Sequence, residues 1–288
     1  MNENNLKALF SDIEETGLLT LYGKAIESQS KDPILDDPYA VAMTKKLDPI
    51  LAGADSKLLQ RLVKKKIDPR MVVHVALRAR KYDAYTRAFL KKHPSGAVVN
   101  IGCGLDARFF RIDNGSVHFF DLDLPQVIRF KKELLDENAR YQMISASMFD
   151  DTWMQKVKQC GAAHWLVMAE GVFMYFEEHQ IKQLVLDLLK HFPGCDLVCE
   201  VVMKEWTHGL LQKMGAMKMK NRLDIGESAG FHFGLDHPAE MESWHQGIRL
   251  IDHWSYFDSN HKKLGIMRLF RHSQYFREMQ YTVHYRLE

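Results

Sequence analysis

The stretch VVNIGCGLDARFF, residues 98–110, decides the fold of this chain. An apolar run rich in β-branched residues enters a Gly-Cys-Gly turn at 102–104 and leaves it through Asp106 and Arg108. A short buried strand that ends in a glycine turn is typical of open α/β sheets, in which ligands bind beyond the carboxyl ends of the strands. The turn is therefore predicted to hold a ligand, either a dinucleotide or a nucleoside that carries no phosphate.

Short apolar runs and helical stretches alternate from residue 97 onward. The apolar runs are typical of buried strands, and the stretches between them have the length and spacing of helices. This alternation predicts right-handed βαβ units and a mostly parallel, doubly wound sheet. The expected strands are AVVNI, SVHFFDLD, YQMISAS, AHWLVMAE and CDLVCEVV, and the clearest helices are LPQVIRFKKELLDEN and EEHQIKQLVLDLLKHF.

Composition and charge argue against several classes of partner. The 39 Lys and Arg residues nearly balance the 37 Asp and Glu residues, and no basic stripe alternates with aromatics, so no nucleic-acid partner is expected. The lysines at 64–66 are predicted to form a solvated helix face. No run of about 18 apolar residues occurs, which predicts no membrane partner. The N-terminus lacks a leader pattern, and neither C-x-x-C nor zinc-ligand spacing occurs, so we expect a cytoplasmic protein with free thiols and no metal.

The chemistry of the glycine turn separates the two candidate ligands. Residues 102–107 match the dinucleotide fingerprint G-x-G-x-x-A, and Asp121 or Asp123 follows at about the expected distance. The charge of Asp106, however, opposes a pyrophosphate, which needs bare backbone N–H groups there. S-adenosylmethionine has the opposite preference, because it lacks phosphate, carries a positive sulfonium and presents a ribose diol to a carboxylate. The residues thus favour S-adenosylmethionine, and a tight turn without a ligand stays open as an alternative.

Three segments of the chain resemble one known family. They are VVNIGCGLDARFFRID, FFDLDLPQVIRFKKELL and MAEGVFMYFEEHQIKQLV, and the resemblance continues through LYGKAIESQSKDPILDDPYA, ALRARKYDAY and FHFGLDHPAEMESWHQGIRLIDHWSYFD. Together they look like the leucine carboxyl methyltransferase family, which includes tetracenomycin-type polyketide O-methyltransferases. The resemblance implies the α/β fold of a class I methyltransferase, Rossmann-like, with a doubly wound, mostly parallel seven-stranded sheet, N-terminal helices and an inserted helical lid. It also implies S-adenosyl-L-methionine as cofactor and methyl transfer to oxygen.

The family's pattern assigns the methionine end of the cofactor to basic residues. A basic residue precedes its D-P-[YL]-A segment and an Arg begins its R-x-R-x-x-D segment, and Lys24 and Arg78 match these positions, with Arg80 nearby. A cation there offers charge-assisted donors to a free carboxylate. The resemblance therefore implies that Lys24 and Arg78 bind the methionine carboxylate. Without it, Arg78 would be read as part of an ion pair on a helix surface.

Other matched positions surround the nucleoside. Gly102 and Gly104 match the family's glycine turn, and Asp123 matches the acid of its D-[LF]-P segment, which holds the ribose. Glu170 and Tyr175 match its E-G-V-x-x-Y segment. Glu170 interrupts an apolar run, and a buried carboxylate without a partner is costly, so a polar ligand is expected there. Tyr175 is either a candidate catalytic residue or a core aromatic, and transfer is otherwise expected to rest on positioning, with no catalytic base assigned.

One position departs from the family's pattern. Where the family commonly has an Asp after the third strand, in A-D-L-R, to meet the adenine amine, this chain has Ala146-Ser147-Met148. Ser147 and Met148 are still predicted to contact the cofactor, because a serine hydroxyl can accept a hydrogen bond without charge assistance.

The chain is predicted to form a single domain over residues 1–288, since no repeat, low-complexity tract or linker divides it. The final stretch LGIMRLFRHSQYFREMQYTVHYRLE is expected to supply an edge hairpin. The expected parts are an N-terminal helical cap at 1–95, a cofactor-binding core at 96–202, a helical lid and acceptor region at 203–250, and C-terminal strands at 251–288.

Several other functions stay open. The segment GESAG at 226–230 matches a nucleophile elbow with Ser228, but no apolar strand precedes it and no helix follows, which favours a lid turn over a serine hydrolase. A NAD-dependent dehydrogenase and a cofactor-binding protein without catalysis are further alternatives. The Met-rich segment favours a small-molecule acceptor. The main alternative is a methyltransferase that acts on the C-terminal carboxyl group of a protein. His232 and His237 are candidates on the acceptor side.

Overall fold

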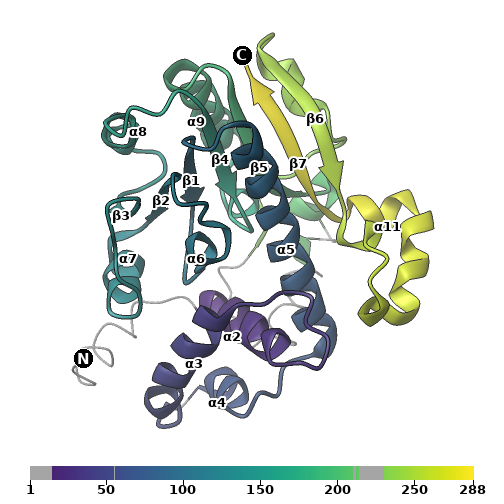
Figure 1. The fold of residues 1–288 in the computed structure, drawn as a ribbon. Helices are drawn as coiled ribbons and strands as arrows, with labels where there is room; N and C mark the ends of the chain where they lie inside the picture. Colours follow the sequence, from purple (N-terminus) through teal and green to yellow (C-terminus); the bar gives the residue numbers. More distant parts are fainter. Residues whose placement is uncertain (1–14, 55, 210–211, 214–229) are drawn as a thin grey trace.

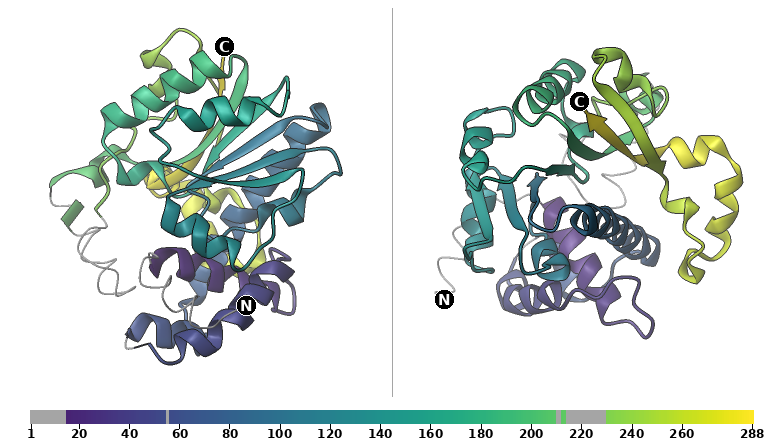
Figure 2. Two further views of the ribbon diagram at one scale, coloured as in Figure 1. Left: turned by 90° about the vertical axis from the view of Figure 1, so that its left-hand side faces the viewer. Right: turned by 45° about the horizontal axis from the view of Figure 1, so that its top comes forward.

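The computed structural model describes residues 15–54, 56–209, 212–213 and 230–288, and a seven-stranded sheet lies at its centre (Figures 1 and 2). The strand order is β3-β2-β1-β4-β5-β7-β6. Strands β1 to β5 pair in parallel, and β7 runs antiparallel to both of its neighbours. The predicted doubly wound, mostly parallel sheet is confirmed. The strands are β1 (Ala97–Ile101), β2 (His118–Asp123), β3 (Tyr141–Ser145), β4 (Trp165–Ala169), β5 (Cys195–Val202), β6 (Ile248–Trp254) and β7 (Gln280–Leu287).

Alternate side chains of the strands build two cores, one on each face of the sheet. Because successive side chains of a strand point to opposite faces, Val98 and Val99 belong to different cores. Helices on both faces explain why strands such as β1 and β5 are buried along their whole length. The Val98 face is covered by α5 (Pro69–Lys92), α6 (Arg108–Ile112) and α7 (Pro125–Lys132), and the Val99 face by α8 (Thr152–Lys158) and α9 (Glu178–His191).

The N-terminal helices lie together at one end of the sheet, and α5 joins them to it (Figure 1). Helix α5 begins after the N-cap Asp68, whose carboxylate accepts from the Arg70 amide, and has Pro69 in its first turn. Its 24 residues span roughly 36 Å, so it packs on α2 near one end and contributes Phe89 and Leu90 to the sheet core at the other. The other N-terminal helices are α2 (Glu15–Ser28), α3 (Pro38–Leu51) and α4 (Lys57–Val63).

The C-terminal part of the chain differs from its prediction. The edge hairpin expected at 264–288 is wrong, because η5 (Lys262–His272) and α11 (Gln274–Glu278) come before β7. The range 251–288, where C-terminal strands were expected, contains the end of β6 and all of β7, with η4 (Tyr256–Asp258) between them as well. Leu264, Met267 and Phe270 recur at every third residue, which is the period of a 3₁₀-helix and not that of a strand. Strand β7 then enters between β5 and β6, so that β6 is the edge of the sheet.

The predicted helical lid at 203–250 lies in part outside the described residues, because these do not include 210–211 and 214–229. The described part of the predicted helical lid at 203–250 contains the 3₁₀ turns η2 (Lys204–Thr207) and η3 (Glu240–Trp244), and β6 begins within it. Ser228 of the GESAG motif lies outside the described residues. The lysines at 64–66 are exposed as expected, but they follow α4 in a turn with Lys65 at φ +53°. Among the helices that the structure describes, none is both long and apolar enough to cross a bilayer.

Candidate active site

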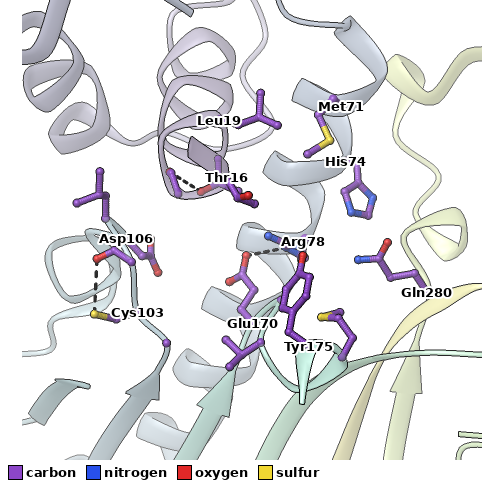
Figure 3. A pocket seen from close by; sticks show the side chains of 18 of the residues that line it. Thr16, Leu19, Met71, His74, Arg78, Cys103, Asp106, Glu170, Tyr175 and Gln280 are labelled. Carbon is purple, nitrogen blue, oxygen red and sulfur yellow. Dashed lines mark hydrogen bonds and ion pairs between the residues drawn. The ribbon is translucent and has the colours of Figure 1, made fainter. Parts of the chain in front are cut away.

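A large cavity lies at the carboxyl ends of strands β1 to β5, beside α2 and α5 (Figure 3). Its volume is about 1620 Å³. The residues that the sequence assigns to the cofactor or to catalysis come from helices, strand ends and loops far apart in the chain, and the fold brings all of them to this cavity. They are Lys24, Arg78, Gly102, Gly104, Asp123, Ser147, Met148, Glu170 and Tyr175.

The glycine turn after β1 shapes one end of the cavity. Gly102 has φ +60° and Gly104 has φ +47°, a backbone region that residues with a Cβ rarely adopt. The Gly102 amide donates to the Leu122 carbonyl at 2.8 Å, and a Cβ on Gly102 would lie 2.4 Å from Val172 Cγ2. A Cβ on Gly104 would instead enter open space, with no atom within 4 Å. Gly104 therefore leaves room for a ligand to approach the backbone closely.

Asp123 is the acid at the end of β2 that faces the cavity. Its Oδ2 accepts from the Gly104 amide at 2.7 Å and its Oδ1 from the Leu124 amide at 2.8 Å. Each oxygen keeps a lone pair for another donor, such as a ribose hydroxyl. Burial raises the pKa of Asp123 more than the two amides lower it. Asp121, the other candidate from the sequence, lies in the core, where it accepts from Asn100, Lys131 and Tyr141.

A buried group of charges beside the turn is centred on Asp106. Its Oδ1 is 2.8 Å from Lys24 Nζ and 3.1 Å from Arg111 Nη2, and its Oδ2 is 3.1 Å from Arg108 Nη1. Burial by itself would raise the pKa of Asp106, but Arg108, Lys24 and Arg111 hold it well below its usual range. The carboxylate is thus ionised and neutralised by neighbours, so it does not face the turn as the bare charge inferred from the sequence.

Arg78 connects this group to acids at the ends of β4 and β5. Its Nε donates to Glu170 Oε1 at 2.9 Å, and its Nη1 donates to Glu200 Oε2 at 2.8 Å. Arg108 donates to the other oxygen of Glu170, and Gln280 donates to the other oxygen of Glu200 at 2.9 Å. Arg78, which the resemblance assigns to a ligand carboxylate, therefore already pairs with two carboxylates of the chain.

The connected network contains one more acid than base. With every group ionised, its five acids and four bases leave a formal charge of −1. A ligand with a net positive charge suits such a site better than a pyrophosphate, because buried charge needs a counter-charge. S-adenosyl-L-methionine carries one net positive charge, on its sulfonium. The bases are Lys24, Arg78, Arg108 and Arg111, and the acids are Asp37, Asp83, Asp106, Glu170 and Glu200.

The loop after β3 forms a mostly apolar wall of the cavity. Ser147 Oγ accepts from the Phe149 amide at 3.3 Å. Met148 is buried, and its carbonyl accepts from Trp153 Nε1 at 3.1 Å. This wall suits a flat base, but the position where the family commonly has a charged acid holds the serine.

The side of the cavity opposite the turn is lined by aromatic and methionine side chains. Figure 3 shows Met71, His74 and Gln280 on that side, opposite Cys103 and Asp106. The segment after β6 contributes most of the rest, namely Tyr256, Phe257, Met267, Phe270, Phe276 and Met279. We call these six residues, together with Met71 and His74, the aromatic chamber.

The acceptor region predicted at 203–250 lies in part outside the described residues. The stretch 203–245 contributes Trp206 and Phe231 to the cavity among its described residues. His232 and His237 do not belong to the described lining, and His232 Nδ1 lies 3.1 Å from a carboxylate oxygen of Glu177 instead.

Two residues of the site, His74 and Glu200, were not predicted, although each has a signal in the sequence. His74 lies four residues before Arg78 on α5, so the two side chains share a helix face. Glu200 is a charged residue inside the apolar run CDLVCEVV, as Glu170 is in its own run. A pairing of Glu200 with Arg78 was not visible, because the two residues lie 122 positions apart.

His74 makes the folded state sensitive to acid. Burial, and after it the neighbouring Arg78, lowers the pKa of His74 from 6.5 to about 3, against a smaller opposing effect of Glu170. Between about pH 3 and about pH 6.5 the unfolded chain binds a proton at His74 that the folded protein does not. The neutral His74 therefore contributes fully to stability above about pH 6.5, and this contribution is lost as the pH falls. The free energy of unfolding, measured in urea between about pH 4 and about pH 6, should rise with pH in the wild type. We expect His74→Leu to remove about 1.4 kcal/mol per pH unit from this slope.

The matched control for this prediction is His179→Leu, an exposed histidine on α9. Its pH slope should equal that of the wild type, because its side chain is exposed and does not belong to the described lining of the cavity. Equal slopes for all three proteins would show that His74 titrates normally in the folded state.

A solved structure shares this arrangement of strands and helices. A DUF574 family protein from Streptomyces avermitilis MA-4680 superposes with a TM-score of 0.56 over 93% of this chain and 97% of that chain, at 13% sequence identity. At this identity the likeness concerns the fold alone. The seven-stranded, mostly parallel sheet, with an antiparallel β7 between β5 and β6, confirms the fold that the resemblance implied.

Comparison with known sequences gives the family. The model of the family described as leucine carboxyl methyltransferase matches residues 17–188. The tetracenomycin polyketide synthesis O-methyltransferase TcmP of Streptomyces glaucescens is 30% identical over 248 residues, which are 86% of this chain and 84% of TcmP. The S-adenosyl-L-methionine-dependent methyltransferase dpfgK of Gibberella zeae is 26% identical, over 84% of this chain and 82% of its own. The chain belongs to the leucine carboxyl methyltransferase family, and it is an S-adenosyl-L-methionine-dependent methyltransferase.

Proposed function

We propose that the protein transfers the methyl group of S-adenosyl-L-methionine to an oxygen atom of a small molecule bound in the same cavity. The observation that carries this proposal is one continuous cavity with a glycine turn and buried charges at one end and the aromatic chamber at the other. Its volume of about 1620 Å³ exceeds the roughly 300–1000 Å³ of a typical ligand pocket, so it has room for cofactor and acceptor together. The name of TcmP, an O-methyltransferase of polyketide synthesis, supports oxygen as the accepting atom.

The nucleoside part of the cofactor is assigned to the turn and the loop after β3. Asp123 accepts hydrogen bonds from the ribose hydroxyls, the left-handed backbone of Gly102 forms the turn, and the absence of a Cβ at Gly104 lets the ligand lie close to the backbone. Ser147 and Met148 contact the adenine. These roles are supported by the shared lining of the cavity and by the open space at Gly104.

The methionine part of the cofactor is assigned to the buried network. Glu170 accepts from the ammonium group, while Lys24 and Arg78 donate to the carboxylate. When bound, the cofactor supplies a methyl group activated by the positive sulfur. The residues of the chain contribute by aligning the acceptor oxygen with that methyl group and by excluding water, and Tyr175 lies at the junction of the two ends of the cavity.

The aromatic chamber favours a small acceptor over the C-terminus of a protein. The cations Arg61, Lys66 and Arg70 also line the cavity, but none of them belongs to the aromatic chamber. Aromatic and methionine side chains instead suit apolar ligands of irregular shape. The acceptor in this proposal is therefore a small molecule, not a protein or a nucleic acid.

We also assign the protein to the cytoplasm. Its four cysteines, Cys103, Cys160, Cys195 and Cys199, are all free thiols, and three of them are buried. Free thiols are typical of proteins from a reducing compartment.

Cofactor binding is tested by calorimetric titration with S-adenosylhomocysteine and, separately, with NADH. We expect the wild type to bind S-adenosylhomocysteine and not NADH. Asp123→Asn should weaken that binding about 10- to 100-fold, because it removes a charged acceptor at the ribose. Asp136→Asn, which changes an exposed acid in the loop after α7, is the matched control and should bind as the wild type does. Binding of NADH, or an affinity that Asp123→Asn leaves unchanged, would contradict the assignment.

A further inference from the structure

A second group of cations lines the cavity beside the start of α5, apart from the buried network. Residues 57–70 contain six Lys and Arg residues and one acid, whereas the whole chain carries a formal net charge of only +2. Three of these six bases have exposed side chains that line the cavity, namely Arg61, Lys66 and Arg70. We call these three residues the cationic rim. The other Lys and Arg residues of the described lining, Lys24 and Arg78, belong to the buried network.

The turn after α4 brings Arg61 and Lys66 together. The Lys66 amide donates to the Arg61 carbonyl at 2.8 Å. The Lys65 amide donates to the Leu62 carbonyl at 2.8 Å, and Lys65 has φ +53°. These are the bonds of a Schellman motif, in which the side chains at the positions of Arg61 and Lys66 frequently form an apolar contact. Here both side chains are cations, and like charges brought close together repel each other unless an anion binds between them.

Two of the three rim cations are available to a ligand. Arg70 is held by Asp68, with Nε 3.2 Å from Oδ1 and Nη2 3.1 Å from Oδ2. Within the part of the chain that the structure describes, the side chains of Arg61 and Lys66 form neither an ion pair nor a hydrogen bond. Lys65, between them in sequence, instead donates to Gln29 Oε1 at 3.0 Å and does not belong to the described lining. The three bases and Asp68 leave a formal charge of +2 at the rim.

The cationic rim is well separated from the buried network. Arg70, His74 and Arg78 follow one another at intervals of four residues on the face of α5 that lines the cavity. The rise of 1.5 Å per residue places Arg70 about 12 Å along the helix from Arg78. Figure 3 shows Met71, His74 and Arg78 in this order along α5, with Tyr175 beside Arg78. A ligand that reaches from Tyr175 to the rim therefore passes a neutral stretch of the cavity.

We infer that Arg61 and Lys66 form a binding site for an anionic oxygen group of the acceptor, such as a carboxylate or a phosphate, which is not the group that is methylated. This inference rests on the proposed function. The apolar part of the acceptor occupies the aromatic chamber, its anionic group lies at the rim, and its accepting oxygen lies at the junction marked by Tyr175. The acceptor class is thus an amphipathic small molecule with its charge at one end.

The exposure of the rim determines how such a site works. Because water reaches Arg61 and Lys66, an anion bound there keeps part of its hydration, and neither partner pays the large desolvation cost of a buried pair. Each contact is correspondingly modest and is weakened by salt. The rim therefore selects the charge and the orientation of the acceptor, while the aromatic chamber supplies most of the buried apolar surface.

The test compares two probes that share a ring system and a hydroxyl group. They are 6-hydroxynaphthalene-2-sulfonate, which is an anion at neutral pH, and the uncharged 6-hydroxynaphthalene-2-sulfonamide. Calorimetry measures their affinity for the full chain saturated with S-adenosylhomocysteine. Arg61→Gln/Lys66→Gln removes two cations of the rim. The matched control, Lys57→Gln/Lys64→Gln, removes two exposed charges from the same helix and turn that do not belong to the described lining.

We expect the wild type to bind the sulfonate about 10-fold more tightly than the sulfonamide. Arg61→Gln/Lys66→Gln should bind the two probes within about 2-fold of each other, because only the contacts with the charge are lost, whereas the control should keep most of the preference. In the wild type, salt at about 500 mM should weaken binding of the sulfonate and not that of the sulfonamide. All three proteins should bind S-adenosylhomocysteine equally, since the rim lies away from the buried network.

Other outcomes separate the two proposals. If the wild type binds S-adenosylhomocysteine but binds neither probe, or binds both equally, the anion site at the rim is overturned and the proposed function is not. An equal loss of preference in both double variants would also overturn it, because it would show a general attraction by the basic stretch and not a site. If the wild type does not bind S-adenosylhomocysteine, the proposed function fails and this inference fails with it.

Discussion

Replacement of Arg108 by methionine is expected to lower the free energy of unfolding by roughly 3–5 kcal/mol, because it leaves buried acids without their cation. Arg108 is 1% exposed and pairs with Asp83, Asp106 and Glu170 at the centre of the network. Denaturant unfolding at neutral pH measures the change. Calorimetry with S-adenosylhomocysteine should show weaker binding as well, since Glu170 loses one of its two arginine partners.

The control for this prediction is Arg140→Met. Arg140 pairs with Asp113 at the surface, where water replaces the lost partner, so its stability should change little. Arg108→Lys should fall between the two, because it keeps the charge but loses the planar fork that reaches several acids at once. An unfolding free energy of Arg108→Met equal to that of Arg140→Met would contradict the central place of Arg108 in the network.

The second large effect is expected for Gly102→Ala. The left-handed backbone at φ +60° costs roughly 1–2 kcal/mol for a residue with a Cβ. The new Cβ would also lie 2.4 Å from Val172 Cγ2, and such overpacking adds roughly 1–3 kcal/mol. Displacement of the turn should move the Gly104 amide away from Asp123, so we expect both a lower free energy of unfolding and a large loss of affinity for S-adenosylhomocysteine.

Two further variants separate the causes. The backbone at Gly115 has φ +84°, and a Cβ there would lie in open space. Gly115→Ala should therefore lower the free energy of unfolding only by the cost of the left-handed backbone, and it should leave ligand affinity unchanged. Adding Val172→Ala to Gly102→Ala should recover the part of stability that overpacking removes. If the double variant is no more stable than Gly102→Ala, the contact with Val172 is not a cause of the loss.

The strands of the core could be predicted from the sequence because their signal is local. Each of the runs AVVNI and CDLVCEVV is apolar along its whole length and is flanked by turn or helix residues, which is the pattern of a strand buried on both faces. The prediction of a strand around Met267 and Phe270 was wrong for a local reason too. Its apolar residues are frequent enough to suggest alternation, and the three-residue spacing that marks a 3₁₀-helix is easily overlooked.

The candidate site was predictable as a set of residues but not as a network. Motifs place Lys24, Arg78 and Glu170 near a ligand, yet they give no information about which side chains pair with one another. Those pairs join residues as far apart in the chain as Arg78 and Glu200, and their distances depend on the packing of α5 against the ends of the strands. The position of His74 in the lining of the cavity likewise depends on this packing, which no single motif encodes.

The position of β7 between β5 and β6 has a consequence for how the protein is made. Strand β6 leaves the ribosome before β7, and in the described sheet it pairs with β7 and not with β5. Until residues 280–287 are available, β6 has no partner and one edge of β5 stays open, which is a state prone to association with other chains. The same late strand carries Gln280, which donates to Glu200. Synthesis of this strand therefore closes the sheet and completes the charge network at the same time.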